Sequence, residues 1–276
     1  MMILAPLRGV TIRSFRIVFA DALREAGFTE AVTPFITATA GYDPLKDREL
    51  RGGESEWLRV TPQFIGKDPS ALKASLERVK AAGYDTADLN CGCPFPMVRN
   101  KGRGSGILRT PDVLRRMLEA GCETMGEGRF SVKARLGVDS ADELLNLMPL
   151  LNEYPLRFLA VHARTARQMY EGRCDLAALR RVEEAAKMPV VRNGDLKLGE
   201  EGMVGRAFVR ALAARGDIGE LLDRYVEASS TELFGERPVL GRLKELLSYW
   251  RESPRWRRRW QVAKTARTLA EIRVWS

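Results

Sequence analysis

The sequence lacks several features that would place it in a special class of protein. No apolar run reaches the roughly 18–20 residues that a bilayer-spanning helix needs, and the first residues lack the charged start and long apolar stretch of a signal peptide. Four cysteines in 276 residues are too few for a disulfide framework, and none has the C-x2-C spacing of a zinc site. There is a single histidine, and we find no internal repeat. We therefore expect a soluble, cytoplasmic protein with reduced thiols and no metal.

Negative charge is scarce at one end of the chain. Of the net charge of +9, +7 comes from the segment between Arg242 and Arg273, which holds ten Lys or Arg and three Glu. Aromatic residues alternate there with arginines: Trp250, Arg251, Arg255, Trp256, Arg257, Arg258, Arg259 and Trp260. Such a concentration of positive charge indicates a polyanionic partner, and arginine suits phosphate groups. We expect the tryptophans to pack in a helical core and the arginines at 255 and 257–259 to face RNA; the alternative is a solvated helix face.

Short apolar runs alternate with amphipathic helical patterns up to about residue 205. Strands are predicted at 2–7, 30–36, 58–65, 86–91, 130–136, 158–163 and 189–193, with a stub at 203–205. Helices are predicted at 14–27, 70–83, 111–125, 141–152 and 175–187. Repeated βα units whose strands are apolar on both faces predict a parallel sheet covered by helices, and eight strands predict a TIM (β/α)8-type barrel.

No strand pattern follows Gly205. Helices are predicted at 208–214, 218–228, 238–250 and 256–272, with turns at Gly216 and Gly235 between them. The chain is therefore expected to form a barrel domain at 1–206 and a small α-helical domain at 207–276.

Polar residues and glycines stand where the predicted strands end. In a TIM barrel these positions face the active site. They are occupied by Ala5, Pro6, Leu7, Gln63, Asn90, Cys91, Cys93, Lys133, Arg135, His162, Asn193, Gly194, Asp195, Gly205 and Arg206. Cys93 also has Pro94 beside it, which restricts its direction, and a loop with three glycines after it. Cys93 is thus a candidate general acid, because a thiol with an ordinary pKa of about 8.5 is mostly protonated at neutral pH; the alternative is a buried structural cysteine.

The motifs at these positions resemble, in their order, those of the tRNA-dihydrouridine synthases. They are APL at 5–7, where the family has APM, NCGCP at 90–94, VKARLG at 132–137, VHART at 161–165, NGD at 193–195 and GR at 205–206. The segment at 242–250 is similar to the helical domain of the bacterial C subfamily.

The resemblance implies an FMN enzyme that uses NADPH to reduce a uridine of tRNA to 5,6-dihydrouridine. A hydride from the flavin would reach C6 of the uracil, and Cys93 would donate a proton to C5 from the opposite side. The barrel at 1–206 would bind the flavin and the helices at 207–276 the tRNA, in a monomer with no membrane partner. The other cysteines, Cys91, Cys122 and Cys174, would be structural.

The resemblance also implies a role for each strand-end residue. Lys133 would contact the electron-rich edge of the reduced flavin, and Gln63 would hydrogen-bond the isoalloxazine ring. His162 would contact the flavin as well, although a lone histidine is more often a satisfied core residue. The phosphate would lie between the NGD and GR motifs, at Asn193, Gly194, Asp195, Gly205 and Arg206. Asn90 and Arg135 are candidates for the substrate side, and the APL segment for the cofactor side.

The segment between Asp195 and Gly205 departs from the family pattern. Only nine residues, Leu196 to Val204, separate them. A parallel crossover usually needs about a dozen residues or more. We therefore expect the seventh helix to be missing and the eighth strand to be short. Three hypotheses remain: a working dihydrouridine synthase with a trimmed barrel, an RNA-binding protein that has lost flavin or turnover, and a flavin enzyme redirected to another reaction.

Overall fold

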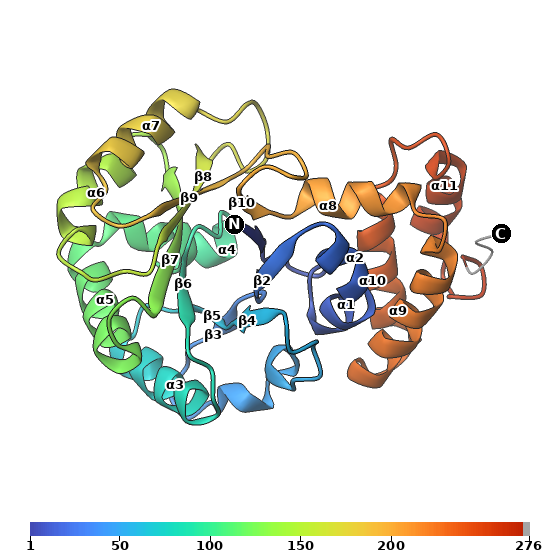
Figure 1. Ribbon diagram of the computed structural model, residues 1–276, viewed down its shortest axis with the longest axis horizontal. Coiled ribbons are helices and arrows are strands. Elements are labelled where there is room, and N and C mark those ends of the chain that lie inside the picture. The colour runs from blue at the N-terminus through green and yellow to red at the C-terminus, as the bar shows by residue number, and fades with distance from the viewer. Residues whose placement is uncertain (273–276) are drawn as a thin grey trace.

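Ten short parallel strands form the sheet at the centre of the computed structural model, which describes residues 1–272 (Figure 1). They are β1 (Met2–Leu4), β2 (Phe28–Val32), β3 (Ile36–Thr37), β4 (Arg59–Thr61), β5 (Gln63–Ile65), β6 (Ala87–Cys91), β7 (Phe130–Gly137), β8 (Leu159–Thr165), β9 (Val190–Asn193) and β10 (Gly202–Val204). The predicted strands at 30–36 and 58–65 are each divided in two. Pro62 separates β4 from β5, as expected of a residue without a backbone N–H.

The sheet closes into a barrel with eight strand positions. Strand β1 pairs with β10 on one side and with β2 on the other, and β2 pairs with β4. Strand β5 continues β4 beyond Pro62 and pairs with β6, and the ring then runs through β7, β8 and β9 to β10. The predicted TIM-type barrel is therefore confirmed.

Amphipathic helices cover most of the barrel. They are α1 (Arg13–Val18), α2 (Ala20–Glu25), α3 (Pro69–Ala81), α5 (Pro111–Met125), α6 (Glu143–Leu151) and α7 (Leu176–Ala185). The predicted helix at 14–27 is thus divided at Phe19. Helix α3 begins after Asp68, whose carboxylate accepts hydrogen bonds from the N–H groups of Ser70 and Ala71, a common N-terminal cap. Short 3₁₀ helices lie at Pro44–Lys46, Arg48–Leu50, Gly104–Arg109 and Leu212–Ala214.

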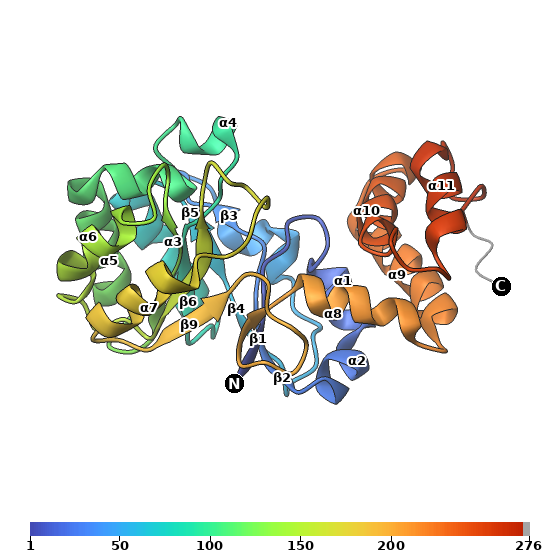
Figure 2. The same ribbon diagram turned by 90° about the horizontal axis from the view of Figure 1, so that it is seen from above.

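The connection from β9 to β10 carries no helix. Residues 194–201, all of which the structure describes, form only turns and bends, and Figure 2 shows this stretch as plain coil. The absence of a helix leaves β9 poorly covered: Val190 and Val191 are half-buried and Arg192 is exposed. Strand β10 pairs with β1 over three residues but with β9 only at Met203 and Asn193. The predicted loss of the seventh helix and shortening of the eighth strand are confirmed, and the barrel nevertheless closes.

The C-terminal helices lie beside α1 and α2 (Figure 2). They are α8 (Arg206–Ala211), α9 (Ile218–Glu232), α10 (Glu236–Ser248) and α11 (Arg257–Thr265). The predicted helix at 256–272 therefore ends early, and Arg273 of the basic segment lies outside the described residues. None of the helices in the described part of the chain is long and apolar enough to cross a membrane.

An aromatic cluster joins these helices to the barrel. Phe15 lies 6.4 Å from Tyr225 of α9 and 6.2 Å from Phe208 of α8, measured between ring centroids. Phe208 also lies 5.0 Å from Phe28 of β2. One continuous hydrophobic core therefore extends from the barrel strands into the helices. The division into two domains at residue 206 stays a prediction.

Candidate active site

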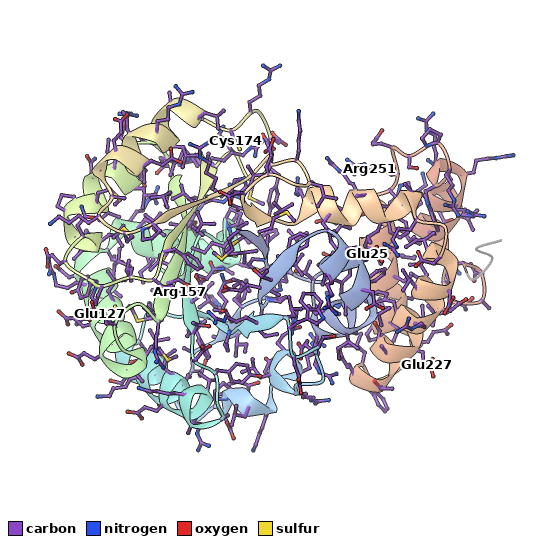
Figure 3. All side chains as sticks on the ribbon, viewed as in Figure 1. Glu25, Glu127, Arg157, Cys174, Glu227 and Arg251 are labelled. Carbon is purple, nitrogen blue, oxygen red and sulfur yellow. The ribbon has the colours of Figure 1, made fainter. Side chains whose placement is uncertain are left out.

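A cavity of about 880 Å³ opens at the carboxyl ends of the barrel strands. Its walls come from the strands β6, β7, β8, β9 and β10, from the loops that follow β1, β2, β6, β8 and β9, and from α8. The predicted site residues that line it are Ala5, Pro6, Leu7, Asn90, Cys93, Lys133, Arg135, His162, Asn193, Gly194, Asp195, Gly205 and Arg206. The opposite end of the barrel is closed by Arg157, labelled in Figure 3, which makes two hydrogen bonds of 2.6 Å to the carboxylate of Glu30.

Cys93 is fixed in the cavity wall by hydrogen bonds on both sides of its peptide unit. Its N–H donates to Oδ1 of Asn90 at 2.8 Å, and its carbonyl accepts from the N–H and the hydroxyl of Ser105 at 3.1 and 2.9 Å. Gly104 packs against it at a φ of +57°, where an added Cβ would stand 2.7 Å from the Cβ of Cys93. Burial raises the pKa of the Cys93 thiol. The thiol is therefore protonated at neutral pH, as a proton donor must be.

Lys133 lines the cavity from β7, the strand next to β6. Its Nζ donates to Oδ1 of Asn193 at 2.9 Å, and Nδ2 of Asn193 donates to the carbonyl of Met203 at 2.6 Å. Burial, reinforced by the neighbouring Arg135, lowers the pKa of Lys133 to about 8. The amine thus keeps its positive charge at neutral pH, next to a polar cavity.

His162 is held in its neutral form. Its Nε2 lies 3.1 Å from Nη1 of Arg164, and because a guanidinium can only donate, Nε2 accepts and the proton sits on Nδ1. Burial and the nearby cations shift the pKa of His162 far below its usual value. Arg164 also donates to the carboxylate of Asp195 at 2.6 Å, which neutralises that charge. The sequence analysis did not select Arg164, although it lies in the VHART motif.

Arg206 lines the cavity and carries a buried side-chain donor that has no partner among the described residues. Its Nε is buried and has no hydrogen-bond partner among residues 1–272. Its guanidinium carbon lies 3.9 Å from the ring centroid of Tyr170. Gly205 allows the chain to pass close to Ala5, whose Cβ would stand 3.0 Å from an added Cβ. A buried donor without an acceptor is costly, so a phosphate oxygen at this point would be stabilised. This arrangement fits the phosphate of a flavin mononucleotide.

Positive charge dominates the cavity. Among the described residues that line it, seven carry a positive charge and only Asp195 carries a carboxylate. The seven are Arg8, Lys133, Arg135, Arg164, Lys197, Arg206 and Arg210. Such a field favours anionic ligands. Sequence analysis missed Arg8, Tyr170, Lys197 and Arg210, because loop and helix residues reach the cavity only through the tertiary fold.

Gln63 lies behind the residues that line the cavity. Its side chain is fully buried and is not among the described residues that line the cavity. Its Nε2 donates to Oδ1 of Asp88 at 2.7 Å, and its Oε1 accepts from Nδ2 of Asn90 at 2.7 Å. The structure thus places Gln63 where it supports Asn90, and a direct contact with a flavin ring stays a prediction that this geometry does not favour.

Asp88 should give the protein a pH-dependent stability. Burial raises the pKa of Asp88 from 3.8 to about 6. Between these values the folded protein binds more protons than the unfolded chain, so the contribution of Asp88 to stability falls as the pH rises through this window. We expect the unfolding free energy of the parent, relative to Asp88→Asn, to decrease by up to about 3 kcal/mol between about pH 4 and pH 6.5 and then to level off. Urea titrations at several pH values measure this difference; a flat profile would contradict it.

The C-terminal helices α8 to α11 and the turns between them form what we call the helical group. The four arginines proposed to face RNA lie on this group, away from the cavity lining. Arg255 and Arg259 lie over the ring of Trp256, at 5.9 and 5.2 Å from its centroid, and the guanidinium of Arg255 donates to the carbonyl of Arg215. Arg257 and Arg258 are exposed. None of the four is among the described residues that line the cavity.

Two of the three tryptophans of the same segment are in the core, as expected, and Trp260 is half-buried and packs against it. Trp250 and Trp256 are each 1% exposed. Their indole N–H groups donate to the carbonyls of Val209 at 2.6 Å and Ala213 at 2.9 Å. The prediction of core tryptophans is confirmed, and RNA contact by the arginines stays a prediction.

Neither a disulfide nor a metal centre accompanies the site. All four cysteines lie within the described residues and are free thiols. Within the same residues, no group of three or more His, Cys, Asp or Glu could hold a metal ion.

Solved structures with a similar fold include a reductase and an old yellow enzyme homologue. Morphinone reductase superimposes with a TM-score of 0.53 at 11% identity, covering 76% of this chain and 82% of that one. The old yellow enzyme homologue from Zymomonas mobilis gives a TM-score of 0.54 at 12% identity, covering 76% and 85%. At this level of identity the likeness concerns the fold alone.

Curated relatives carry a more specific name. The tRNA-dihydrouridine synthase B of Vibrio vulnificus is 28% identical over 204 residues, which cover 72% of this chain and 61% of the relative. The corresponding protein of Pseudomonas aeruginosa is 30% identical over 237 residues, covering 82% and 69%. The chain spans about three fifths of the length of the first of these relatives. Both carry the B designation, so the C-subfamily resemblance of residues 242–250 stays a prediction.

The family match covers the barrel. The family model described as "Dihydrouridine synthase (Dus)" matches residues 3–203. This range includes every motif named above except GR at 205–206. This range is well over half of the chain and contains the thiol, amine and imidazole that line the cavity. The chain therefore belongs to the dihydrouridine synthase family.

Proposed function

We propose that this protein reduces a uridine of tRNA to 5,6-dihydrouridine, with FMN as cofactor and NADPH as reductant. The observation that carries the proposal is the protonated thiol of Cys93, fixed in the wall of a cation-lined cavity on a barrel of this family. The names of the relatives support tRNA as the substrate class. A tRNA substrate also implies a cytoplasmic location.

Several residues would hold the cofactor. Arg206, with the backbone at Gly205 and Gly194, would bind the phosphate, and Lys133 and His162 would contact the ring system. A flavin bound there, with NADPH as its reductant, would supply the hydride for C6 of the uracil. The positive charge of Lys133 stabilises negative charge on a neighbouring group in this buried site.

The protein itself would supply a proton and hold the uracil base in the right orientation. Cys93 donates its thiol proton to C5, so that one hydride and one proton saturate the double bond. Arg135 is held by the carbonyls of Gly92 at 3.0 Å and Thr165 at 2.9 Å, and remains charged although burial lowers its pKa to about 10. Arg135 and Asn90, which line the cavity together with Cys93, would orient the base.

The test begins with the visible spectrum of the purified protein. A flavin spectrum that persists after gel filtration supports the proposal, and its absence, even after addition of FMN, supports an RNA-binding protein without turnover. Oxidation of NADPH that depends on an unmodified tRNA transcript, with dihydrouridine found in the product, supports the proposed reaction. Flavin-dependent NADPH oxidation without any tRNA requirement would instead favour a redirected flavin enzyme.

The helical group should supply a measurable part of the affinity for tRNA. Replacing Arg255, Arg257, Arg258 and Arg259 with glutamine is expected to weaken binding. Removal of one phosphate contact lowers the slope of log K against log salt by up to about one unit, so the four substitutions together lower it by up to about four. Fluorescence anisotropy at several salt concentrations measures the slope.

A matched control uses four exposed arginines on the barrel. These are Arg116, Arg129, Arg180 and Arg181, changed to glutamine. This variant has the same net charge as the first but keeps the helical group intact. An equal decrease of slope in both variants would mean that binding follows overall charge, and an unchanged slope in the first would make its arginines a solvated face.

A further inference from the structure

A line of hydrogen bonds runs behind the cavity wall from a buried carboxylate to the backbone of Cys93. Nε2 of Gln63 donates to Oδ1 of Asp88 at 2.7 Å, and Nδ2 of Asn90 donates to Oε1 of Gln63 at 2.7 Å. Oδ1 of Asn90 then accepts from the N–H of Cys93 at 2.8 Å and from that of Gly92 at 3.1 Å. The line joins β5, the neighbouring strand β6 and the loop that follows β6.

The carboxylate fixes the direction of the line at one end, and the backbone fixes it at the other. An ionised carboxylate can only accept, whereas a side-chain amide presents a donor on one side and an acceptor on the other. Gln63 must therefore turn its NH2 group toward Asp88 and its oxygen toward Asn90. Asn90 must in turn give its NH2 group to Gln63, which leaves its oxygen for the N–H of Cys93. At the other end of the line the N–H groups of Gly92 and Cys93 can likewise only donate, so both ends require the same orientation of the two amides. The carboxylate adds the strength of a charged acceptor to this arrangement.

The surroundings of Asp88 favour this arrangement. Oδ2 of Asp88 accepts from the hydroxyl of Ser131 at 2.7 Å, so both carboxylate oxygens are occupied. Asp88 and Gln63 are fully buried and Asn90 is 7% exposed, so water does not compete for these groups. The charged groups that face Asp88 are Lys133 on β7, Glu30 on β2 and Arg157, which precedes β8. At neutral pH Asp88 is mostly ionised, since its pKa is about 6.

We propose that Asp88 is a positioning residue for Cys93: its carboxylate orients the amides of Gln63 and Asn90 and thereby holds the thiol where it donates its proton. The proposal rests on the proposed function in one respect, that Cys93 is the proton donor. The hydrogen-bond line itself does not depend on that function, and it can be tested without turnover.

The first variant is Asp88→Asn, which keeps the size of the side chain but can both donate and accept. The backbone N–H groups still favour the same orientation of Asn90, but the line loses its charged acceptor, so Gln63, Asn90 and the loop at Gly92 and Cys93 are held less firmly. We expect faster hydrogen exchange at these two amides. We also expect uridine reduction by the pre-reduced protein to slow by roughly 10- to 100-fold, the size of effect seen when a supporting residue is removed or a reacting group is misplaced. Reduction of the flavin by NADPH, which does not use Cys93, should stay within about two-fold.

The second variant, Gln63→Glu with Asp88→Asn, restores a charged acceptor within the line. The carboxylate is moved one position along the line, where it accepts from the new amide at position 88 on one side and from Asn90 on the other. Ser131 can still donate, now to the amide oxygen at position 88. We expect this double variant to recover both slow exchange and most of the uridine reduction. Gln63→Glu alone places two carboxylates in contact, and it should slow uridine reduction more than Asp88→Asn or the double variant does.

The control is Glu30→Gln, which removes another buried carboxylate of the barrel interior that has no hydrogen bond to the line. It should lower stability but slow both half-reactions alike and leave exchange at Gly92 and Cys93 unchanged. The proposal is overturned if Asp88→Asn behaves like Glu30→Gln, or if the double variant is no better than Asp88→Asn. A parent that binds flavin yet makes no dihydrouridine would refute the proposed function, and the exchange measurements would then decide the role of Asp88 by themselves.

Discussion

Replacing Cys93 with alanine is expected to slow dihydrouridine formation by about 10²- to 10⁴-fold, the usual cost of losing a general acid. The fold should persist, because the backbone N–H and carbonyl of residue 93 make the hydrogen bonds to Asn90 and Ser105. Flavin content should also persist, since the proposed phosphate and ring contacts come from other strands. Single-turnover reduction of an unmodified tRNA transcript by pre-reduced protein measures the effect.

The matched control is Cys91→Ala, two residues earlier at the end of β6. Cys91 is fully buried in the hydrophobic core on the other side of β6, and burial raises its pKa far above neutrality. Its replacement should cost some stability but leave most of the activity. Equal activity of Cys93→Ala and the parent would sink the assignment of the proton donor, whereas equal decreases in both variants would indicate a packing effect.

Arg206→Ala is expected to weaken FMN binding by roughly 10- to 150-fold, because a charge-assisted hydrogen bond contributes about 1.5–3 kcal/mol. The buried Nε of Arg206 has no partner among residues 1–272, so the phosphate would be its acceptor. Riboflavin has the same ring and no phosphate, and its weaker binding should be almost unaffected. Fluorescence titration of both ligands into parent and variant measures the two affinities.

The comparison between the two ligands separates the phosphate contact from general damage. If both ligands weaken equally, Arg206 is structural, and its packing over Tyr170 becomes the reason. If Arg206→Lys recovers FMN binding only in part, the planar guanidinium matters in addition to the charge. A parent that binds neither ligand would mean that the short connection between β9 and β10 has disabled the flavin site.

The cavity could be largely predicted because its residues stand at strand ends. Asn193 is the last residue of β9, whereas Lys133 and His162 lie near the middle of β7 and β8, strands that extend further than the apolar runs in the sequence. The missing helix could also be predicted, since nine residues are too few for a helix and a return. These inferences need only the local order of residues along the chain.

The rest depended on contacts that the chain order does not contain. Tyr170 reaches Arg206 across a loop, and Arg210 enters the cavity from a helix whose rotation is set by packing. Gln63 was expected at the flavin, but Asp88, on the neighbouring strand in the barrel interior, takes its NH2 group. Which of several polar neighbours a buried amide chooses follows from the closed barrel and not from any motif.

The aromatic cluster between the barrel and the C-terminal helices has a consequence for the choice of nucleotide. Phe15, Phe208 and Tyr225 fix the helices against the barrel as parts of one core, so the spacing between the basic helical surface and Cys93 belongs to the fold and does not vary. If tRNA binds that surface as proposed, it would present to the thiol only those nucleotides that lie at this spacing in its own folded shape. The cluster would then determine which uridine reaches Cys93. A shift of the C-terminal helices by one helical turn against the barrel would select a different uridine, although no residue that contacts the uridine had changed.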